Sequence, residues 1–401
     1  MTASSPGRPA ALSLRLSAFY FAHFILIGIA LPYWPVWLQG RGLGPIEIGI
    51  VLSVGRWVSV GTTPIFAMLA DRRGELKILL VLLTSGLLAS YTANHFAHGF
   101  WPLFAIAVCT AVFFSPITPV SESLTMLHAL RGEVDYSRVR MWGSISFILA
   151  SFLGGALLGA WQADAILWAI SASVAMSIAV AACLPDTRSE LFARRRGAFQ
   201  QLARHRVMLL FLAAVGLLAS SHAALYAFGT IYWRQAGISD HVIGLLWAEG
   251  VIAEILLFWV GGAFMRRVRP AHAMLLSAAG GVLRWTVLAV STDPGVLFAV
   301  QWLHALTFAA AHLGGMAFVA RAAPPGFSAT VQSLYATIGT GAATALAILL
   351  VGPIYAAFGG GAYYVMAALS LLGGAAAWLL LRSWDGRRIE LAAGGPAPSA
   401  S

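Results

Sequence analysis

Long runs of apolar residues dominate this chain, and short polar stretches interrupt them at nearly regular intervals. About twelve runs are long enough to span a bilayer, since roughly 20 apolar residues cross its core as a helix. The runs cover 13–39, 46–70, 75–96, 99–128, 137–160, 163–184, 207–235, 240–265, 271–291, 294–320, 327–357 and 360–382. The alternation of apolar and polar residues typical of strands is missing, so we expect helices rather than a barrel to satisfy the backbone hydrogen bonds.

The spacing of the runs predicts two halves of six helices each. The only long polar connector, at about 185–206, divides the runs six and six. The halves also show a weak internal match, in which "RGLGPIEIGIVLSVG" (41–55) aligns with "AGISDHVIGLLWAEG" (236–250). The sequence therefore predicts an all-α membrane protein of twelve helices, with an N-terminal bundle at 13–184, a central loop at 185–206 and a C-terminal bundle at 207–385. Duplicated bundles of this kind place a substrate site between the halves, near the midplane of the membrane.

Composition excludes a soluble protein, and the placement of charge argues against a nucleic-acid partner. Residues are 59% hydrophobic and 10% charged, whereas soluble domains carry about 25% charged residues. The net charge of +10 comes from basic residues concentrated at alternate loops, such as 72–77, 131–140, 188–206 and 266–269. This positive-inside bias predicts that both termini and the central loop are cytoplasmic. The two cysteines, Cys109 and Cys183, lie in separate apolar runs and indicate neither a disulfide nor a metal site.

Ionisable residues within the apolar runs are the candidates for function, because a charge at mid-membrane costs about 2.5–3.5 kcal/mol on insertion scales. The set is Arg56, Arg284, Glu122, Glu249, Glu254, His23, His222, His304 and His312. Two arginines against three glutamates suggest partners around one aqueous cavity, with one carboxyl group free to hold a proton. Burial disfavours the charged form of an acid or an imidazole, so these groups can exchange protons, whereas arginine stays charged. Static ion pairs that only lock helices together are the alternative.

Helical phase separates these candidates further. His304 and His312 are eight residues apart, which is about 80° around a helix of 3.6 residues per turn, so they share a broad face. Glu249 and Glu254 differ by about 140° on the same geometry and are expected to have different surroundings. The alternative for both histidines is that they are hydrogen-bonded core residues.

The loop after the second run resembles the signature of the major facilitator superfamily. "LADRRGELK" (69–77) has Asp71 and Arg72 in place, although Glu75 stands where a basic residue is common. The resemblance implies a conformational gate, because Asp71 at a helix end can accept contacts in one state and release them in the other. A solvated charged turn is the alternative.

Four further motifs resemble the phenylpropionate transporter branch of that superfamily, among the lactose-permease-like proton symporters. They are "DYSRVRMWGSISF" (135–147), "LPYWPVWL" (31–38), "FFSPITPVSESL" (113–124) and "IGLLWAEGVIAE" (243–254), and the resemblance covers roughly 15–385. It implies proton-coupled uptake across a bacterial inner membrane by alternating access. By position, it implies an acid–arginine pair of Glu122 with Arg138 or Arg140 at the gate. It also implies a coupling set in the C-terminal half, made of Glu254, Arg284, His304 and His312. We expect Glu122 to take part in proton coupling together with Glu254, His304 and His312.

From this resemblance we expect the cargo to be a small aromatic or otherwise apolar carboxylate, whose charged group an arginine would bind. The expected substrate-binding residues are Arg56, His222, Tyr226, Arg284, Tyr33 and Trp247. Arg56 lies one turn before the second-span arginine of the branch, where Ser59 stands here, which weakens the inference about the substrate.

Several other functions stay open at this stage. A sugar or nucleoside symporter would use the same proton machinery, and drug efflux is a further possibility within transport. A haem protein could draw axial ligands from His222, His304 and His312 but needs no buried glutamates and arginines. A channel would need charged rings or a filter motif, and neither is present. We expect no enzyme activity, no cofactor and no metal; the expected partners are a small molecule, protons and the lipid bilayer, with the chain acting as a monomer.

Overall fold

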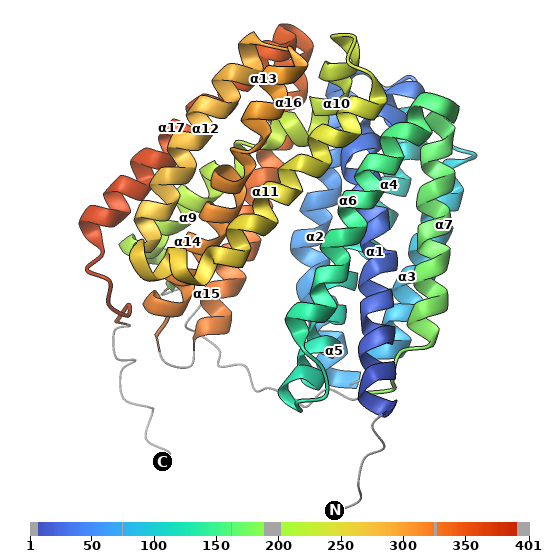
Figure 1. Ribbon diagram of the computed structural model, residues 1–401, viewed down its shortest axis with the longest axis horizontal. Helices are drawn as coiled ribbons and strands as arrows, with labels where there is room; N and C mark the ends of the chain where they lie inside the picture. Colours follow the sequence, from blue (N-terminus) through green and yellow to red (C-terminus); the bar gives the residue numbers. More distant parts are fainter. Residues whose placement is uncertain (1–6, 74, 162, 188–201, 325–326, 391–401) are drawn as a thin grey trace, which may run out of the picture.

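The computed structural model is helical throughout its described part, which comprises residues 7–73, 75–161, 163–187, 202–324 and 327–390 (Figure 1). Only the backbone is described at 7–9, 67–68, 70–73 and 329. The helices of the N-terminal half are α1 (Gly7–Gly40), α2 (Pro45–Arg73), α3 (Leu76–Asn94), α4 (Phe100–Phe114), α5 (Ile117–Leu130), α6 (Tyr136–Trp161) and α7 (Ala163–Ala182). Those of the C-terminal half are α9 (Arg206–Ser220), α10 (Ala223–Gln235), α11 (Asp240–Arg267), α12 (Pro270–Val290), α13 (Pro294–Gln301), η1 (Ala305–Ala310), α14 (Ala311–Ala322), α15 (Ser328–Leu334), η2 (Tyr335–Ala342), α16 (Ala343–Phe358), η3 (Gly359–Gly361) and α17 (Ala362–Ser383).

These elements combine into twelve spans, which confirms the predicted fold class. Eleven apolar helical stretches are long enough to cross a membrane, and the last, Thr330–Ser383, has 54 residues. That length suffices for two crossings of roughly 20 residues each, and η3 divides it into α15–η2–α16 and α17. Two other spans are stacked pairs of helices, α4 with α5 and α9 with α10. Of the predicted central loop, residues 188–201 lie outside the described residues.

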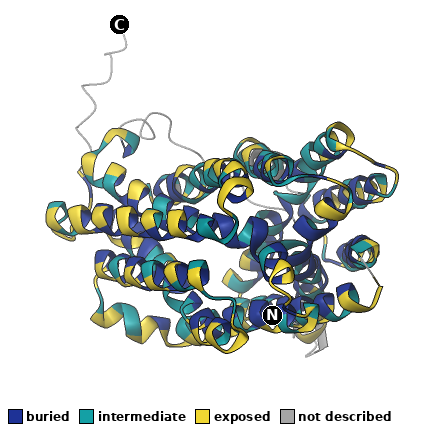
Figure 2. Ribbon diagram, turned by 90° about the horizontal axis from the view of Figure 1, so that it is seen from above, coloured by how far each residue is buried: buried dark blue, intermediate teal, exposed yellow. Residues whose placement is uncertain are grey.

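The helices of each half pack mainly on one another, and the two sets stand side by side (Figure 1). We call the end where α1 begins and α17 ends the termini end, and the opposite one the far end. Along the outer helices, exposed and buried residues alternate within each turn, because one face of the helix packs on neighbours and the other faces outward (Figure 2).

At the far end the two halves interlock through small residues. The α6 glycine Gly155 lies so close to the carbonyl oxygen of Asp240, at the start of α11, that a side chain there would collide with it. A Cβ added to Gly49 of α2 would lie 3.1 Å from the Cα of Gly352 in α16. Small residues permit such close helix packing in membranes, and the far end is therefore sealed by backbone contacts.

Toward the termini end the halves part. One buried apolar cluster runs through the N-terminal half into the far end of the C-terminal half, joining residues such as Leu26 and Trp247. The C-terminal half has a separate apolar cluster near the termini end, which includes Phe211, Phe318 and Leu380. Because each half has its own core there, a space between them is left for polar side chains.

Candidate functional site

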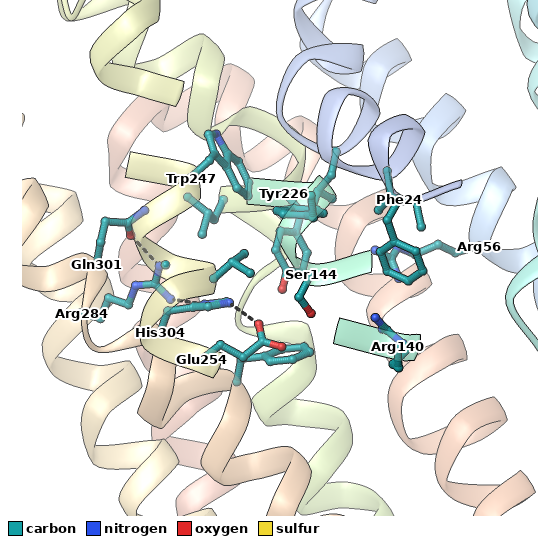
Figure 3. Close-up of a pocket in the computed structure, with 17 residues that line it drawn as sticks. Phe24, Arg56, Arg140, Ser144, Tyr226, Trp247, Glu254, Arg284, Gln301 and His304 are labelled. Atoms are coloured by element: carbon teal, nitrogen blue, oxygen red, sulfur yellow. Dashed lines mark hydrogen bonds and ion pairs between the residues drawn. The ribbon is translucent and has the colours of Figure 1, made fainter. Parts of the chain in front are cut away.

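A cavity of about 390 Å³ lies between the two halves. Its charged and polar lining residues are Arg56, Arg140, Ser144, Tyr226, Glu254, Arg284, Gln301 and His304, and its apolar wall includes Phe24, Leu31, Phe147, Leu225 and Trp247. In Figure 3, Arg284, His304 and Glu254 project from the C-terminal half, and Phe24, Arg56 and Arg140 from the opposite side. A charged, partly apolar space of this size between the halves suits a small amphipathic solute.

Arg284 of α12 is the centre of a hydrogen-bonded network on the C-terminal wall. Its side chain is only 1% exposed. Nη2 donates to Oε1 of Gln301 at 2.6 Å, and Nη1 donates to Oγ1 of Thr307 at 2.9 Å and to Nδ1 of His304 at 3.0 Å. The guanidinium also lies 4.7 Å from the ring centroid of Trp285, which is a cation–π distance. Neutral acceptors therefore occupy both terminal nitrogens of this arginine.

The arginine also determines how His304 is protonated. A guanidinium can only donate hydrogen bonds, so Nδ1 of His304 must accept. In a neutral imidazole this assigns the proton to Nε2, which lies 3.5 Å from Oε2 of Glu254. Arg284, His304 and Glu254 thus form a polar chain that ends at a carboxyl group on the cavity wall (Figure 3).

The N-terminal wall is more loosely paired. Arg56 of α2 lines the cavity and makes no hydrogen bond or ion pair with any described residue. Nε of Arg140 lies 3.8 Å from Oε1 of Glu122, and both side chains are partly exposed. The Arg140 guanidinium also lies 4.2 Å from the ring centroid of Phe24. This wall therefore offers positive charge that the protein itself neutralises only weakly.

A second cavity of about 410 Å³ adjoins the first and shares Arg56, Tyr226 and Phe308 with it. His222 and His312 line this second space. The ring of Phe308 stacks on His304 at 5.3 Å and on His312 at 6.3 Å between centroids, so the three rings form one column. Phe308 belongs to the π-helix η1, and the π-helix η2 lines the same cavity. Such π-helical turns are frequent at functional sites.

The structure brings most of the predicted site residues together. Arg56, Tyr226, Trp247, Glu254, Arg284 and His304 line the first cavity, and His222 and His312 line the second. His222 stacks on Tyr226, with ring centroids 5.5 Å apart. Glu249 does not share the surroundings of Glu254, as the helical phase predicted, because it is absent from the lining of both cavities.

Other predicted residues lie elsewhere. Tyr33 is fully buried at the far end, where its hydroxyl donates to the carbonyl of Ser151 at 2.5 Å, so it contributes to the seal rather than to the cavity. Arg138 is exposed, and its Nε lies 3.6 Å from Oδ2 of Asp135, which leaves Arg140 as the partner of Glu122. Asp71 and Arg72 belong to α2, but their side chains lie outside the described residues.

Sequence reasoning missed three residues that shape the site: Gln301, Thr307 and Phe308. Gln301 and Thr307 are each three residues from His304, the spacing at which side chains of a helix are neighbours. Both bind Arg284. Thr307 also contacts Nε2 of His222 at 3.2 Å. The sequence signal that could have found Gln301 and Thr307 is a neutral polar residue one helical turn from a candidate histidine. The prediction considered ionisable and aromatic residues and therefore missed them.

The geometry of the histidines disfavours haem between them. Nδ1 of His222 lies 3.2 Å from the carbonyl oxygen of Leu218 and Nε2 lies 3.2 Å from Oγ1 of Thr307, so neither ring nitrogen of this histidine is free to ligate an iron. Among the described residues, no cluster of three or more histidine, cysteine, aspartate or glutamate side chains is arranged to hold a metal ion.

Comparison with known proteins agrees with this architecture. A family model described as the MFS_1 like family matches residues 13–366. The probable 3-phenylpropionic acid transporter of Escherichia coli (strain K12) is 33% identical over 360 residues, covering 89% of this chain and 94% of that protein. The maltose permease of Geobacillus stearothermophilus is 26% identical over 369 residues, covering 90% and 93%.

The solved structure of the nucleoside transporter NupG has a TM-score of 0.81 at 17% identity, covering 92% of this chain and 98% of the other. At that identity the likeness concerns the fold alone. The proteins that match are transporters and not enzymes. The chain therefore belongs to the MFS_1 like family and is a major facilitator transporter of the phenylpropionate transporter branch.

Proposed function

We propose that this transporter carries a small aromatic or otherwise apolar carboxylate, such as a phenylpropionate, across a bacterial inner membrane together with protons. The observation that carries the proposal is the chain of Arg284, His304 and Glu254 on the wall of the central cavity. It connects a fixed positive charge to a carboxyl group that can bind and release a proton. The relative from Escherichia coli, named as a probable 3-phenylpropionic acid transporter, supports this class of cargo.

Arg56 is the proposed partner of the carboxylate. The terminal nitrogens of Arg284 already donate to three neutral groups, on Gln301, Thr307 and His304. Its Nε has no hydrogen-bond partner among the described residues, but the side chain is only 1% exposed, so an anion reaches it less readily than it reaches Arg56. Arg56 lines both cavities without an ion pair among the described residues, and it can offer two parallel N–H donors to a carboxylate. The aromatic wall that includes Phe147 would pack against the cargo's apolar end.

Glu254 is the proposed proton carrier, with His304 and Arg284 holding its environment. Nε2 of His304 lies 3.5 Å from Oε2 of the glutamate, and an N–H group at that position would favour the charged form of the carboxyl group. A rotation of one bundle (13–184) against the other (207–385) would change this distance and the access of water to the carboxyl group. The protonated carboxyl group of Glu254 would then be favoured in one state and the charged carboxylate in the other. Coupling requires such a difference in proton affinity between the two states. His312, stacked behind Phe308, is a proposed accessory relay, and His222 supports Thr307.

The proposed cycle uses the two ends of the molecule alternately. The basic clusters favour a cytoplasmic termini end and central loop, so the sealed far end would face outward and the cavity would serve the cytoplasm. Opening the far end would separate Gly155 from Asp240 and Gly49 from Gly352, while the Arg140–Glu122 pair and the Asp71–Arg72 turn would close the termini end. Within this cycle the chain works as a monomer, because both cavity walls belong to one chain.

Transport into proteoliposomes tests the proposal. Purified protein is reconstituted, a pH gradient that is acidic outside is imposed, and uptake of radiolabelled 3-phenylpropionate is followed. We expect accumulation above the external concentration, which a protonophore abolishes, and no accumulation of the uncharged amide. Accumulation that persists with the protonophore would contradict proton coupling, and efflux as the only gradient-driven flux would favour the drug-export alternative.

A sugar cargo is the second candidate, because the relative from Geobacillus stearothermophilus that is named a maltose permease matches over 93% of its length. The same vesicles distinguish the two classes by competition. We expect benzoate-like acids, and not maltose or a nucleoside, to inhibit uptake of 3-phenylpropionate. Uptake of maltose in place of the acid would contradict a carboxylate cargo and would favour a proton-coupled sugar transporter.

A further inference from the structure

A third hollow lies away from the central site, on the outer face of the C-terminal half. It has a volume of about 480 Å³ and lies between α9, the η2–α16 span and α17. Nearly all its lining is aliphatic, including Leu209 and Leu217 of α9, Leu346 and Leu350 of α16, and Leu369 of α17. Leu209, Leu346 and Leu350 are each about half exposed, so the hollow is an open groove that faces the bilayer.

The groove continues a stripe on α9 that begins with basic residues. Arg206 is followed at helical intervals of three or four residues by the groove residues Leu209, Ala213 and Leu217. Arg206 and the neighbouring Arg204 are exposed, and neither has an ion-pair partner among the described residues. Positive charge therefore lies at the termini end of an apolar channel along the membrane face.

The dimensions of the stripe match one leaflet. Eleven residues separate Arg206 from Leu217, which at 1.5 Å per residue is a rise of about 16 Å. Half of the hydrocarbon core of a bilayer is about 15 Å. A chain that entered the groove with its polar group beside Arg206 would thus end near the midplane.

We propose that this groove binds one anionic phospholipid of the leaflet on the termini side. Its phosphate group lies against Arg206 and Arg204, and one acyl chain lies along Leu209, Ala213 and Leu217. The aliphatic lining supplies contact area without selectivity, and the arginines select the anionic headgroup. This site does not depend on which solute the central cavity carries.

Native mass spectrometry of the purified full-length chain tests the proposal, with phosphatidylglycerol and phosphatidylcholine of identical acyl chains as probes. We expect one phosphatidylglycerol to bind with a clear preference. Each arginine near a membrane surface contributes about fivefold in affinity for anionic lipid, so Arg206→Gln should lower the preference about fivefold and Arg204→Gln/Arg206→Gln further. Arg206→Lys should retain it, because phosphate needs the charge rather than the planar fork.

Matched variants separate this site from general attraction. Arg131→Gln removes an exposed arginine at the same end of the other half and should leave the preference unchanged. Ala213→Trp fills the groove and should weaken both lipids, whereas Ala175→Trp, at an exposed position of α7, should not. Equal loss with Arg131→Gln and Arg206→Gln would overturn the proposal. So would binding unchanged in Ala213→Trp, or a shift of that variant from dimer to monomer, which would assign the groove to a second copy of the chain.

Discussion

The two walls of the central cavity differ in how completely their charges are partnered. On the C-terminal wall, Arg284 is buried and bonded to Gln301, Thr307 and His304. On the N-terminal wall, Arg56 has no partner among the described residues. Arg140 is loosely paired, because its Nε comes no closer than 3.8 Å to Oε1 of Glu122. A buried charge must be hydrogen-bonded or paired within the protein, whereas a charge that faces water can be solvated until a ligand binds. This difference is the basis of the proposal that the more fully bonded C-terminal wall couples protons and that the open N-terminal wall recognises the anion.

The largest effect is expected at Glu254, where the polar chain of Arg284, His304 and Glu254 ends on the cavity wall. Glu254→Gln replaces the carboxyl group by a permanently neutral group of the same shape, so no proton can be carried. We expect proton-driven accumulation of 3-phenylpropionate to disappear while counterflow exchange persists, as measured in proteoliposomes. Glu249→Gln is the matched control, because it changes a glutamate of the same helix that lines neither cavity. Accumulation at the normal rate in Glu254→Gln, with loss in Glu249→Gln, would move the coupling role to Glu249.

The two arginines should respond differently to the same change. Hydrogen bonds to a charged group contribute about 1.5–3 kcal/mol, so Arg56→Gln should weaken binding of the acid by roughly 10- to 150-fold and leave its amide nearly unaffected. Arg284→Gln should impair the acid and the amide alike, because it disrupts the wall rather than one contact. Binding of both ligands is measured by thermal shift and isothermal calorimetry. If Arg284→Gln were the variant selective for the acid, the assignment of the two walls would be reversed.

A smaller effect is expected when only the support of Arg284 is removed. Gln301 accepts from Arg284 and donates to the carbonyl of Leu246 at 2.8 Å, so it ties α12 and α11 together. Gln301→Ala leaves a buried donor unsatisfied, which costs about 1–3 kcal/mol of stability. We expect a lower melting temperature and a reduced coupling ratio with cargo affinity retained, and Gln301→Glu should restore much of the stability by pairing with Arg284. Full stability of Gln301→Ala would show that water replaces the amide.

The sequence predicted the twelve spans closely because each is a long apolar run whose length the bilayer dictates. It also made His304 and Glu254 candidates, because an ionisable group in such a run is costly without a role, and both line the central cavity. Periodicity could not predict the far-end seal, since placing Tyr33 there depends on how two halves meet. Counting charged residues could not find Gln301 and Thr307 either, because both are neutral. Their role becomes visible only when the structure shows that Arg284 donates hydrogen bonds to them.

The smallest effect is expected at the loosely paired acid and arginine of the open wall. Arg140 and Glu122 are 3.8 Å apart and partly exposed, and exposed pairs of this kind contribute about 0–1 kcal/mol. Glu122→Gln should therefore change thermal stability little, and cargo affinity by no more than about fivefold. If this pair closes the termini end during the cycle, its effect should appear in the exchange rate rather than in affinity, because only the transition between states is altered. Arg138→Gln is the control, at an exposed position of α6, the helix that carries Arg140, and this arginine pairs with Asp135. Rates that are equal in Glu122→Gln and the unaltered protein would exclude the pair from the gate. A loss of affinity as large as that of Arg56→Gln would show that this paired acid and arginine also bind cargo, so that the lack of a partner would no longer distinguish the groups that recognise the anion.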